Sequence, residues 1–273
     1  MRRRKALLFL LEIAIAALAA VVLIPLLIIV VNSFKGVREA ALFQLTLPGE
    51  WVFSNYQTVF RQANVLRGFK NSFLLSGGTV LAVNFLASMA AFVIQRRESP
   101  AARWSYYVFI VGLIMPVSIV PTIKLLMDLK LHGTYLGIIM YYTGVMLPFA
   151  VFLFTGFMKT IPRELDEAAV IEGAGPFRLY FHIVAPLLKP ALITVTIITT
   201  IAVWNDFFGP FYLITDSTKW TIVLQIFRFV TLYSTNWGVV FAFMVIVISP
   251  VLIIYLLLQR YIIEGLVAGS LKG

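Results

Sequence analysis

Long apolar stretches recur along the whole of this 273-residue chain. Lipid offers no hydrogen-bond partner to backbone groups, so an apolar stretch of about 20 residues that crosses a bilayer has to be helical. Hydrophobic residues make up 61% of the chain and charged residues only 12%, a balance typical of multi-pass membrane proteins. We therefore predict an all-α integral membrane protein with one transmembrane domain, residues 1–273. Its predicted spans are about 6–31, 71–95, 104–126, 135–158, 190–215 and 238–259.

The N-terminus resembles a secretory signal peptide, because four basic residues, Arg2 to Lys5, precede an apolar run. That run continues from Ala6 to about Val31, well beyond the roughly 7–15 residues of a signal-peptide core. We expect a signal anchor that remains in the membrane.

Loop charges predict the orientation of the spans. Basic residues collect in cytoplasmic loops, so the side of the membrane with more Lys and Arg is taken as the inside. With the N-terminus inside, 13 of the 22 Lys and Arg fall in the inner segments and 9 in the longer outer ones. This bias favours cytoplasmic N- and C-termini and also places the segment 159–189 in the cytoplasm. It also explains the net charge of +10 without a nucleic-acid partner.

Several kinds of chemistry are excluded by the residues that the sequence lacks. There is no cysteine, so disulfides and thiolate sites are impossible. The two histidines, His132 and His182, do not form the paired motif of zinc hydrolases, and no phosphate-binding GxxxxGK[ST] loop occurs. An intramembrane transferase would need clustered acid–base residues. The carboxylates Glu12 and Asp206 are far apart in the sequence, so we predict a chain without catalytic activity.

The polar segment 159–189 interrupts the apolar pattern with a distinct local structure. Pro162 suits a first helical turn, and the acidic residues that follow it lie near the positive end of a helix. Gly173 and the Gly-Pro pair at 175–176 end this first short helix. A second helix, 177–184, is expected to end before Pro186. The segment is thus predicted to form an elbow of two short helices, and its plainest interpretation is an amphipathic connector.

The spacing in this elbow resembles the EAA coupling loop of ABC-transporter permeases. The residues that carry the resemblance are Glu167-Ala168-Ala169, then Gly173-Ala174 after three intervening residues, and finally Ile183 and Pro186. The wider segment PRELDEAAVIEGAGPFRLYFHIVAPLLKP, the WNDF at 204–207 and the closing QRYIIEGLVAGSLKG are similar to bacterial carbohydrate importers, in particular to the inner permease subunit of maltose transporters. Glu172 departs from the family, which often has Asp before the glycine.

The resemblance implies a type I ABC importer permease fold in a bacterial cytoplasmic membrane. The chain would form half of the pathway for a mono- or oligosaccharide, beside a second permease chain, two copies of a cytoplasmic ATPase and an extracytoplasmic solute-binding protein. It would bind no cofactor, since the ATPase would use the ATP and Mg. Another polar solute, such as glycerol phosphate or a polyamine, is the alternative cargo. The residues implied in ATPase coupling are Glu164, Glu167, Ala168, Ala169, Glu172, Gly173, Ala174 and Pro186.

Polar residues inside spans are candidates for a substrate path, because they are costly in lipid. Asn205 and Asp206 lie beside aromatic residues. Polar groups next to aromatic rings can bind a sugar, because the polar groups hydrogen-bond to its hydroxyls while the rings pack on its apolar face. Alternatively, Asp206 caps or gates the helix bundle, and the other polar groups make interhelical hydrogen bonds. The candidate path residues are Trp204, Asn205, Asp206, Phe207, Asn84 and Tyr141.

Two further segments carry expectations about partners. By resemblance, the tail residues Gly269, Ser270 and Lys272 reach between the two ATPases, although a frayed terminus is the simpler interpretation. The exterior segments 33–70 and 216–237 are candidates to receive the solute-binding protein. Alternatively, they form an amphipathic cap over the pore.

Overall fold

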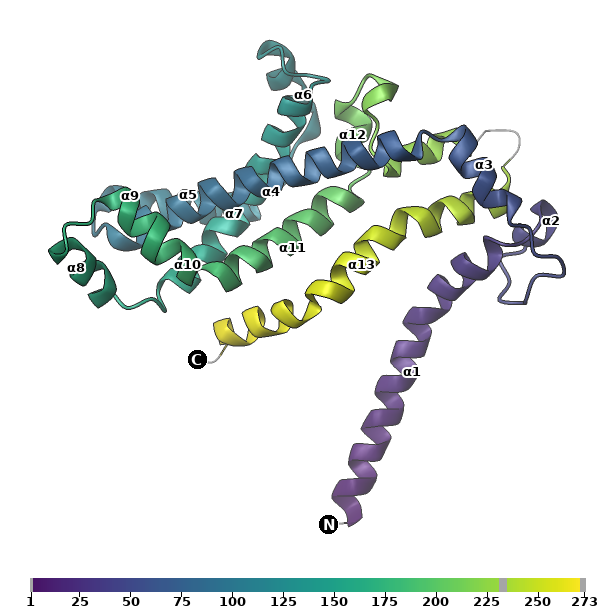
Figure 1. Ribbon diagram of the computed structural model, residues 1–273, viewed down its shortest axis with the longest axis horizontal. Helices are drawn as coiled ribbons and strands as arrows, with labels where there is room; N and C mark the ends of the chain where they lie inside the picture. Colours follow the sequence, from purple (N-terminus) through teal and green to yellow (C-terminus); the bar gives the residue numbers. More distant parts are fainter. Residues whose placement is uncertain (1, 231–234, 271–273) are drawn as a thin grey trace. The chain divides into compact units, whose positions relative to one another are not determined.

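The computed structural model describes residues 2–230 and 235–270, and every regular element in these ranges is a helix (Figure 1). The all-α prediction is therefore confirmed for the described part of the chain. The residues group into two compact units. Unit 1 combines Met1–Leu66 with Gln225–Pro250, and unit 2 combines Arg67–Leu224 with Val251–Gly273.

Unit 1 contains one long apolar helix and several short ones. Helix α1 exposes large apolar side chains all along its length, from Leu8 to Val30, and its window of highest hydropathy is 0% buried. A helix that is apolar on every side is suited to lipid. The helices of this unit are α1 (Arg2–Asn32), α2 (Val37–Ala40), α3 (Ser54–Gln62) and the N-terminal part of α13 (Trp237–Ser270).

A buried polar cluster holds the loop after α1. Lys35 is fully buried, and its Nζ donates to the carbonyl oxygen of Gln44 at 2.8 Å and to the hydroxyl of Thr46 at 3.1 Å. The side-chain amide of Asn55 donates to the carbonyl oxygens of Ser33 and Lys35, both at 2.9 Å. Because buried polar groups need such partners, these bonds fix the loop against α3.

Unit 2 is built around α4, α7 and α11. Its core combines small residues of α4, such as Ala87 and Ala91, with the larger Phe154 and Met158 of α7. Small residues let helix backbones approach closely, which is how helices pack in lipid. The elements of this unit are α4 (Val65–Arg96), α5 (Pro100–Ile114), α6 (Ile119–Asp128), α7 (Tyr135–Met158), α8 (Glu164–Ile171), α9 (Pro176–Leu179), a π-helical turn (Tyr180–Val184), α10 (Ala185–Leu187), α11 (Lys189–Asn205), α12 (Phe208–Leu213), a 3₁₀ turn (Ser217–Lys219) and the C-terminal part of α13. A second 3₁₀ turn, Val223–Arg228, spans the boundary between the units.

The stretch predicted as one span at 104–126 is two helices, α5 and α6. Helix α5 ends at Ile114, and the backbone of the next residue, Met115, is extended (φ −69°, ψ 126°). Pro116 follows, and a proline pushes the residue before it out of the helical conformation. Pro121 then lies in the first turn of α6, where its missing N–H is harmless.

The stretch 190–215 is also interrupted, between α11 and α12. Asp206 is extended (φ −71°, ψ 124°) and separates the two helices. At the other end of α11, the helical segment Pro176–Leu187 meets Lys189–Asn205 at a bend of 74°. By contrast, Pro25, Pro148 and Pro250 remain inside continuous helices.

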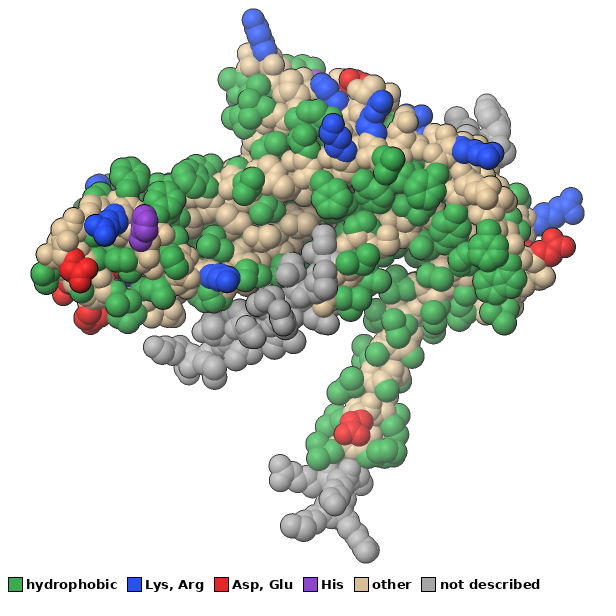
Figure 2. Space-filling view, in the orientation of Figure 1, with side chains coloured by type: hydrophobic (Ala, Val, Ile, Leu, Met, Phe, Trp, Pro, Cys, Tyr) green, Lys and Arg blue, Asp and Glu red, His purple; other side chains and the backbone are tan. Residues whose placement is uncertain are grey.

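Three described helices are long and apolar enough to cross a membrane: Leu11–Asn32, Val65–Arg96 and Tyr135–Met158. The bent pair around Leu188 makes a fourth if it is counted as one span, and Trp237–Ile253 is a shorter apolar helix. These helices agree with a membrane protein. In unit 2, Figure 2 shows apolar side chains over the visible flank, with charged residues mostly towards its two ends.

Candidate functional site

The elbow begins with α8, and local sequence features explain where this helix begins and where it ends. Its first turn carries Glu164, Asp166 and Glu167, and acidic residues stabilise the positive end of a helix. At the other end Gly173 has φ +81°, in the left-handed region that favours glycine. The Gly173 N–H donates to the Val170 carbonyl oxygen and the Ala174 N–H to that of Ala169, both at 2.9 Å, which is the Schellman pattern of helix ends.

The exposed face of α8 mixes acidic and apolar side chains. Glu164, Glu167, Ala168 and Glu172 are all exposed, and acidic residues gather over this end of the unit in Figure 2. Two apolar neighbours that the sequence reasoning missed are exposed as well: Ile171 at 86% and Phe177 at 70%. They were detectable as large apolar residues in an otherwise polar segment.

Ala169 lies on the opposite face of α8. It is only 4% exposed and packs in the apolar core with residues of α4 and α7. Ala174 is half-buried against the same core. These two of the expected coupling residues therefore fasten the elbow to the bundle, while the glutamates face outwards.

Ion pairs fix α8 to the end of α4. Arg96 pairs with Asp166 at 2.5 Å, and both side chains are mostly buried, with 13% and 16% exposed. The same guanidinium donates to the carbonyl oxygen of Ile161 at 3.3 Å. A second pair, Arg163 with Glu98 at 2.6 Å, is exposed. Because the first pair is shielded from water, loss of one of its partners would leave an uncompensated charge and cost more than loss of a partner from the second.

The second arm of the elbow differs from the expected helix 177–184. Helical backbone starts at Pro176 and continues past Pro186 to Leu187, with a π-helical turn from Tyr180 to Val184. The Ala185 N–H donates to the Tyr180 carbonyl oxygen, five residues earlier. A proline ring crowds the carbonyl four residues before it, and a wider turn relieves this crowding, so the helix continues past Pro186.

A second group of candidate residues meets where α11 ends. Asp206 accepts hydrogen bonds at Oδ1 from the Phe208 N–H (3.0 Å) and at Oδ2 from the Gly209 N–H (3.1 Å) and the Tyr142 hydroxyl (3.0 Å). Gly209 has no room for a side chain, since a Cβ there would collide with Oδ2 of Asp206 and lie 3.0 Å from the Tyr142 hydroxyl. The sequence reasoning missed this glycine, which follows the acidic residue by three positions.

A cavity of about 300 Å³ opens beside this carboxylate. Three of the expected path residues, Tyr141, Asn205 and Asp206, contribute to its wall. The arrangement offers an aromatic ring, an amide and a carboxylate to one ligand. The remaining lining residues are Tyr142, Val145, Met146 and Ala202.

The other expected path residues lie elsewhere. Trp204 is buried against Phe69 and Phe73 of α4, with ring centroids 6.0 and 5.0 Å apart. Phe207 stacks on Phe211. The Asn84 amide donates to the Thr196 hydroxyl at 2.8 Å, which is an interhelical hydrogen bond of the kind considered as the alternative.

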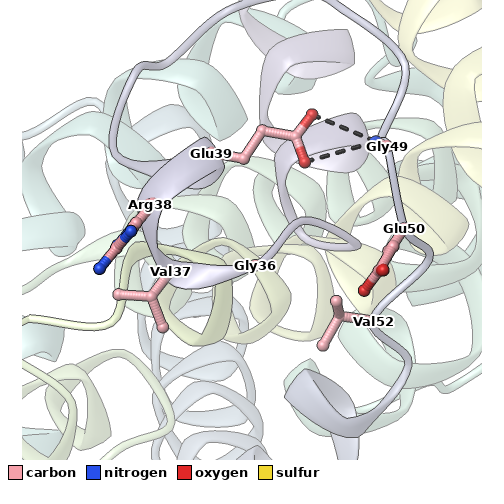
Figure 3. A pocket seen from close by; sticks show the side chains of 7 residues that line it. All are labelled: Gly36, Val37, Arg38, Glu39, Gly49, Glu50 and Val52. Atoms are coloured by element: carbon pink, nitrogen blue, oxygen red, sulfur yellow. Dashed lines mark hydrogen bonds between the residues drawn. The ribbon is translucent and has the colours of Figure 1, made fainter.

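A second cavity, of about 430 Å³, lies in unit 1 within the segment expected on the outside. Figure 3 shows Glu39 reaching over to the backbone of Gly49, which donates to its carboxylate at 3.3 and 3.4 Å. Arg38 and Glu50 also line it. Among the expected tail residues, Gly269 and Ser270 end helix α13, and Lys272 lies outside the described residues.

Comparison with known proteins places nearly the whole chain in one family. Residues 2–267 match the family described as binding-protein-dependent transport system inner membrane component. The diacetylchitobiose uptake system permease protein NgcG of Streptomyces coelicolor is 33% identical over 258 residues, which cover 93% of this chain and 85% of that protein. The probable starch degradation products transport system permease protein AmyC of Thermoanaerobacterium thermosulfurigenes is 34% identical over 250 residues, or 91% of each chain.

The fold is also that of a solved transporter chain. A crystal structure of a bacterial ABC transporter involved in the import of the acidic polysaccharide alginate superposes with a TM-score of 0.85. It covers 96% of this chain and 98% of that chain at 21% identity, so the likeness concerns the fold. Together with the apolar helices, these matches establish that the chain is a membrane protein and belongs to the family of inner membrane permease components of binding-protein-dependent transport systems.

Proposed function

We propose that this chain is a permease subunit of an ATP-driven importer of mono- or oligosaccharides. The observation that carries the proposal is similarity over nearly the whole chain to permeases named for the uptake of diacetylchitobiose and of starch degradation products. The chain forms half of the pathway, and a second permease chain forms the other half. It is a multi-pass protein of a bacterial cytoplasmic membrane.

The proposed topology has six crossings with both termini in the cytoplasm. The crossings are α1, α4, α5 with α6, α7, α11 with α12, and α13. The excess of Lys and Arg in the inner segments supports this orientation. It places the elbow 159–189 in the cytoplasm and the segment 33–70 outside.

Two copies of a cytoplasmic ATPase drive the transporter, one of them docked on this elbow. The chain is non-catalytic and binds no cofactor, and the ATPase uses ATP and Mg. The exposed Glu164, Glu167 and Glu172 offer ionic partners, and Ile171 and Phe177 offer apolar contacts. When the ATPases close on ATP, they displace the elbow. Since Arg96 and Asp166 join α8 to α4, the bundle moves with it and opens the pathway outwards.

The sugar passes the cavity at Asp206. Tyr141 offers an aromatic face for the apolar side of a pyranose ring, and Asn205 and Asp206 offer hydrogen-bonding groups for its hydroxyls. The side chains of Trp204, Phe207 and Asn84 position the surrounding helices. An extracytoplasmic solute-binding protein delivers the sugar to the segments 33–70 and 216–237, and the tail at Gly269, Ser270 and Lys272 contacts the ATPases.

The test is purification and reconstitution of the complete transporter. A tag on this chain, in its native cell, should recover an ATPase, a second permease and a solute-binding protein. In liposomes, these subunits should accumulate radiolabelled chito- or malto-oligosaccharides only when ATP is supplied to the ATPase. Uptake of glycerol 3-phosphate or spermidine, with none of the sugars, would replace the carbohydrate assignment. Recovery of this chain alone, in several mild detergents, would contradict the importer.

A further inference from the structure

The helix α4 carries buried polar contacts at both of its ends, and each joins it to a different loop. One end meets the segment 216–222, between α12 and the part of the chain that returns to unit 1. The other end meets the elbow. All these residues belong to unit 2.

The first joint is centred on Asn71. Its side-chain amide donates to the carbonyl oxygens of Thr218 and Trp220, both at 2.9 Å, and its Oδ1 accepts from the Tyr135 hydroxyl at 2.9 Å. Asn71 is 3% exposed, so these bonds are sheltered from water. One amide therefore ties the loop 216–222 to α4 and α4 to the start of α7.

Neighbouring contacts fix the same loop. The buried Ser72 hydroxyl accepts from the N–H of Ile222 at 3.0 Å. Lys219 donates to the carbonyl oxygen of Gly133 at 2.8 Å. Within the loop, the Thr218 N–H donates to Asp216, and this bond lowers the pKa of the Asp216 carboxyl.

The second joint is between Ser88 and Tyr180, two buried residues whose hydroxyl oxygens are 2.5 Å apart. Ser88 also bonds the carbonyl oxygen of Asn84 at 2.5 Å, which uses its single proton. The Tyr180 hydroxyl is therefore the donor in the contact with Ser88. Tyr180 opens the π-helical turn of the elbow, and its ring packs on Phe92 of α4 at 5.4 Å.

Between the joints α4 is an uninterrupted helix. It runs without a break from Val65 to Arg96. Ser88 lies 17 positions after Asn71, which corresponds to roughly 26 Å at 1.5 Å per residue, about the thickness of a bilayer core. A helix hydrogen-bonded along its whole length resists stretching, so a displacement at one joint reaches the other.

We infer that α4 is the connecting element that transmits movement between the elbow and the loop 216–222, through the Ser88–Tyr180 joint at one end and the Asn71 joint at the other. The inference rests on the proposed function in one respect: the elbow receives the ATPase, and the loop lies on the receptor side. Tyr180 and Asn71 are then positioning residues that act through α4 and touch neither ATP nor sugar.

Hydrogen exchange tests the connection without any partner. The full chain is placed in lipid nanodiscs, and amide exchange at 218–222 is followed by mass spectrometry. Tyr180→Phe removes only the donor hydroxyl, and Tyr107→Phe removes the same atom from an exposed ring of α5. We expect exchange at 218–222 to be about three- to tenfold faster in Tyr180→Phe than in Tyr107→Phe, which corresponds to one hydrogen bond.

Two serines of α4 calibrate that experiment. Ser72→Ala removes the acceptor of the Ile222 N–H and should raise exchange there directly. Ser76→Ala, one turn further on, removes a buried hydroxyl with no hydrogen bond among the described residues and should leave it unchanged. If Tyr180→Phe is poorly folded by gel filtration, Ser88→Ala replaces it. The inference would be overturned if the folded variant exchanged amides at 218–222 no faster than its control, which is Tyr107→Phe for Tyr180→Phe and Ser76→Ala for Ser88→Ala.

The reconstituted transporter gives a second readout. We expect Tyr180→Phe to lower the amount of sugar imported per ATP hydrolysed by about three- to tenfold, whereas simple loss of folded protein lowers both rates equally. If Tyr180→Phe imports as much sugar per ATP hydrolysed as Tyr107→Phe does, this also counts against the inference. If the wild-type complex hydrolyses ATP without importing any solute, the proposed function fails, and the exchange experiment still decides whether α4 connects the two loops.

Discussion

The hydroxyl of Tyr142 in α7 donates a 3.0 Å hydrogen bond to Oδ2 of Asp206, the residue that separates α11 from α12. The same oxygen accepts from the Gly209 N–H, while Oδ1 accepts only from the Phe208 N–H among the bonds described. Because a carboxylate oxygen can accept two bonds, Oδ1 keeps capacity for a sugar hydroxyl. One carboxylate thus caps a helix, joins two others and borders the cavity.

We expect Asp206→Ala to lower the free energy of unfolding by about 1–2 kcal/mol, because it removes a helix cap. Tyr142→Phe should lower it by about 0.5–1.5 kcal/mol through one lost hydrogen bond. The two residues share that bond, so the double variant should lose less than the sum. Thermal unfolding in detergent measures all three, with Tyr141→Phe as the control. Strict additivity would show that the bond contributes nothing.

Gly173 gives a prediction about the elbow alone. Its φ of +81° is unfavourable for a residue with a Cβ, although no atom lies within 4 Å of where that Cβ would be. Gly173→Ala should therefore lower stability by about 1–2 kcal/mol through the backbone only. Asn tolerates this conformation better, so Gly173→Asn should cost less. Limited proteolysis at the α8–α9 turn measures local opening, and equal cleavage in both variants would contradict the explanation.

The two ion pairs of α8 should differ in strength. Arg96 and Asp166 are 13% and 16% exposed, whereas Arg163 and Glu98 are 51% and 78% exposed. Removing one partner of a buried pair leaves an uncompensated charge and costs about 3–5 kcal/mol, so we expect roughly 2–4 kcal/mol for Asp166→Ala. Glu98→Ala should cost less than about 1 kcal/mol. Chemical unfolding of both variants compares them, and equal losses would refute the ranking.

The sequence predicted the helix content and the first arm of the elbow well, because both follow from local rules. Apolar runs long enough to span a bilayer can only be helical, and Gly173 and the acidic first turn mark the ends of α8. The prediction of unbroken spans was less accurate. Pro148 lies inside a continuous helix, whereas Pro116 follows a break. Packing against neighbouring helices decides whether a helix continues through a proline or breaks at it, and this packing cannot be read from the sequence.

The direction in which individual side chains point also could not be predicted from the sequence. Ala168 and Ala169 look equivalent in the motif, yet the first is exposed and the second is buried in the core. Trp204 and Asn205 are likewise adjacent, but the tryptophan packs on α4 and the amide borders the cavity. The contact between Ser88 and Tyr180 joins residues 92 positions apart, and no local sequence pattern predicts it.

Charge reversal at Glu167 tests the ionic part of the proposed docking face. This carboxylate is exposed, so Glu167→Lys should leave folding and assembly with the second permease intact. ATP-dependent uptake should fall at least tenfold, because a like charge would then face the basic group that we expect on the ATPase. Glu167→Gln removes the charge without reversing it and should have a smaller effect. Normal uptake by an assembled Glu167→Lys complex would remove this residue from the docking face.

Ile171 tests the apolar part of the same face. It is 86% exposed at the end of α8, and burying a side chain of this size in an interface contributes about 1.5–3 kcal/mol. Ile171→Asp should therefore weaken binding of the ATPase by about 10- to 100-fold, whereas Ile171→Leu should bind nearly normally. Leu47, 77% exposed in the proposed exterior segment, provides the control Leu47→Asp.

Recovery of the ATPase with the tagged chain at increasing salt measures binding. Apolar contact is insensitive to screening, so the contribution of Ile171 should persist at high salt while that of Glu167 declines. Equal recovery with Ile171→Asp and Leu47→Asp would place the ATPase on another surface.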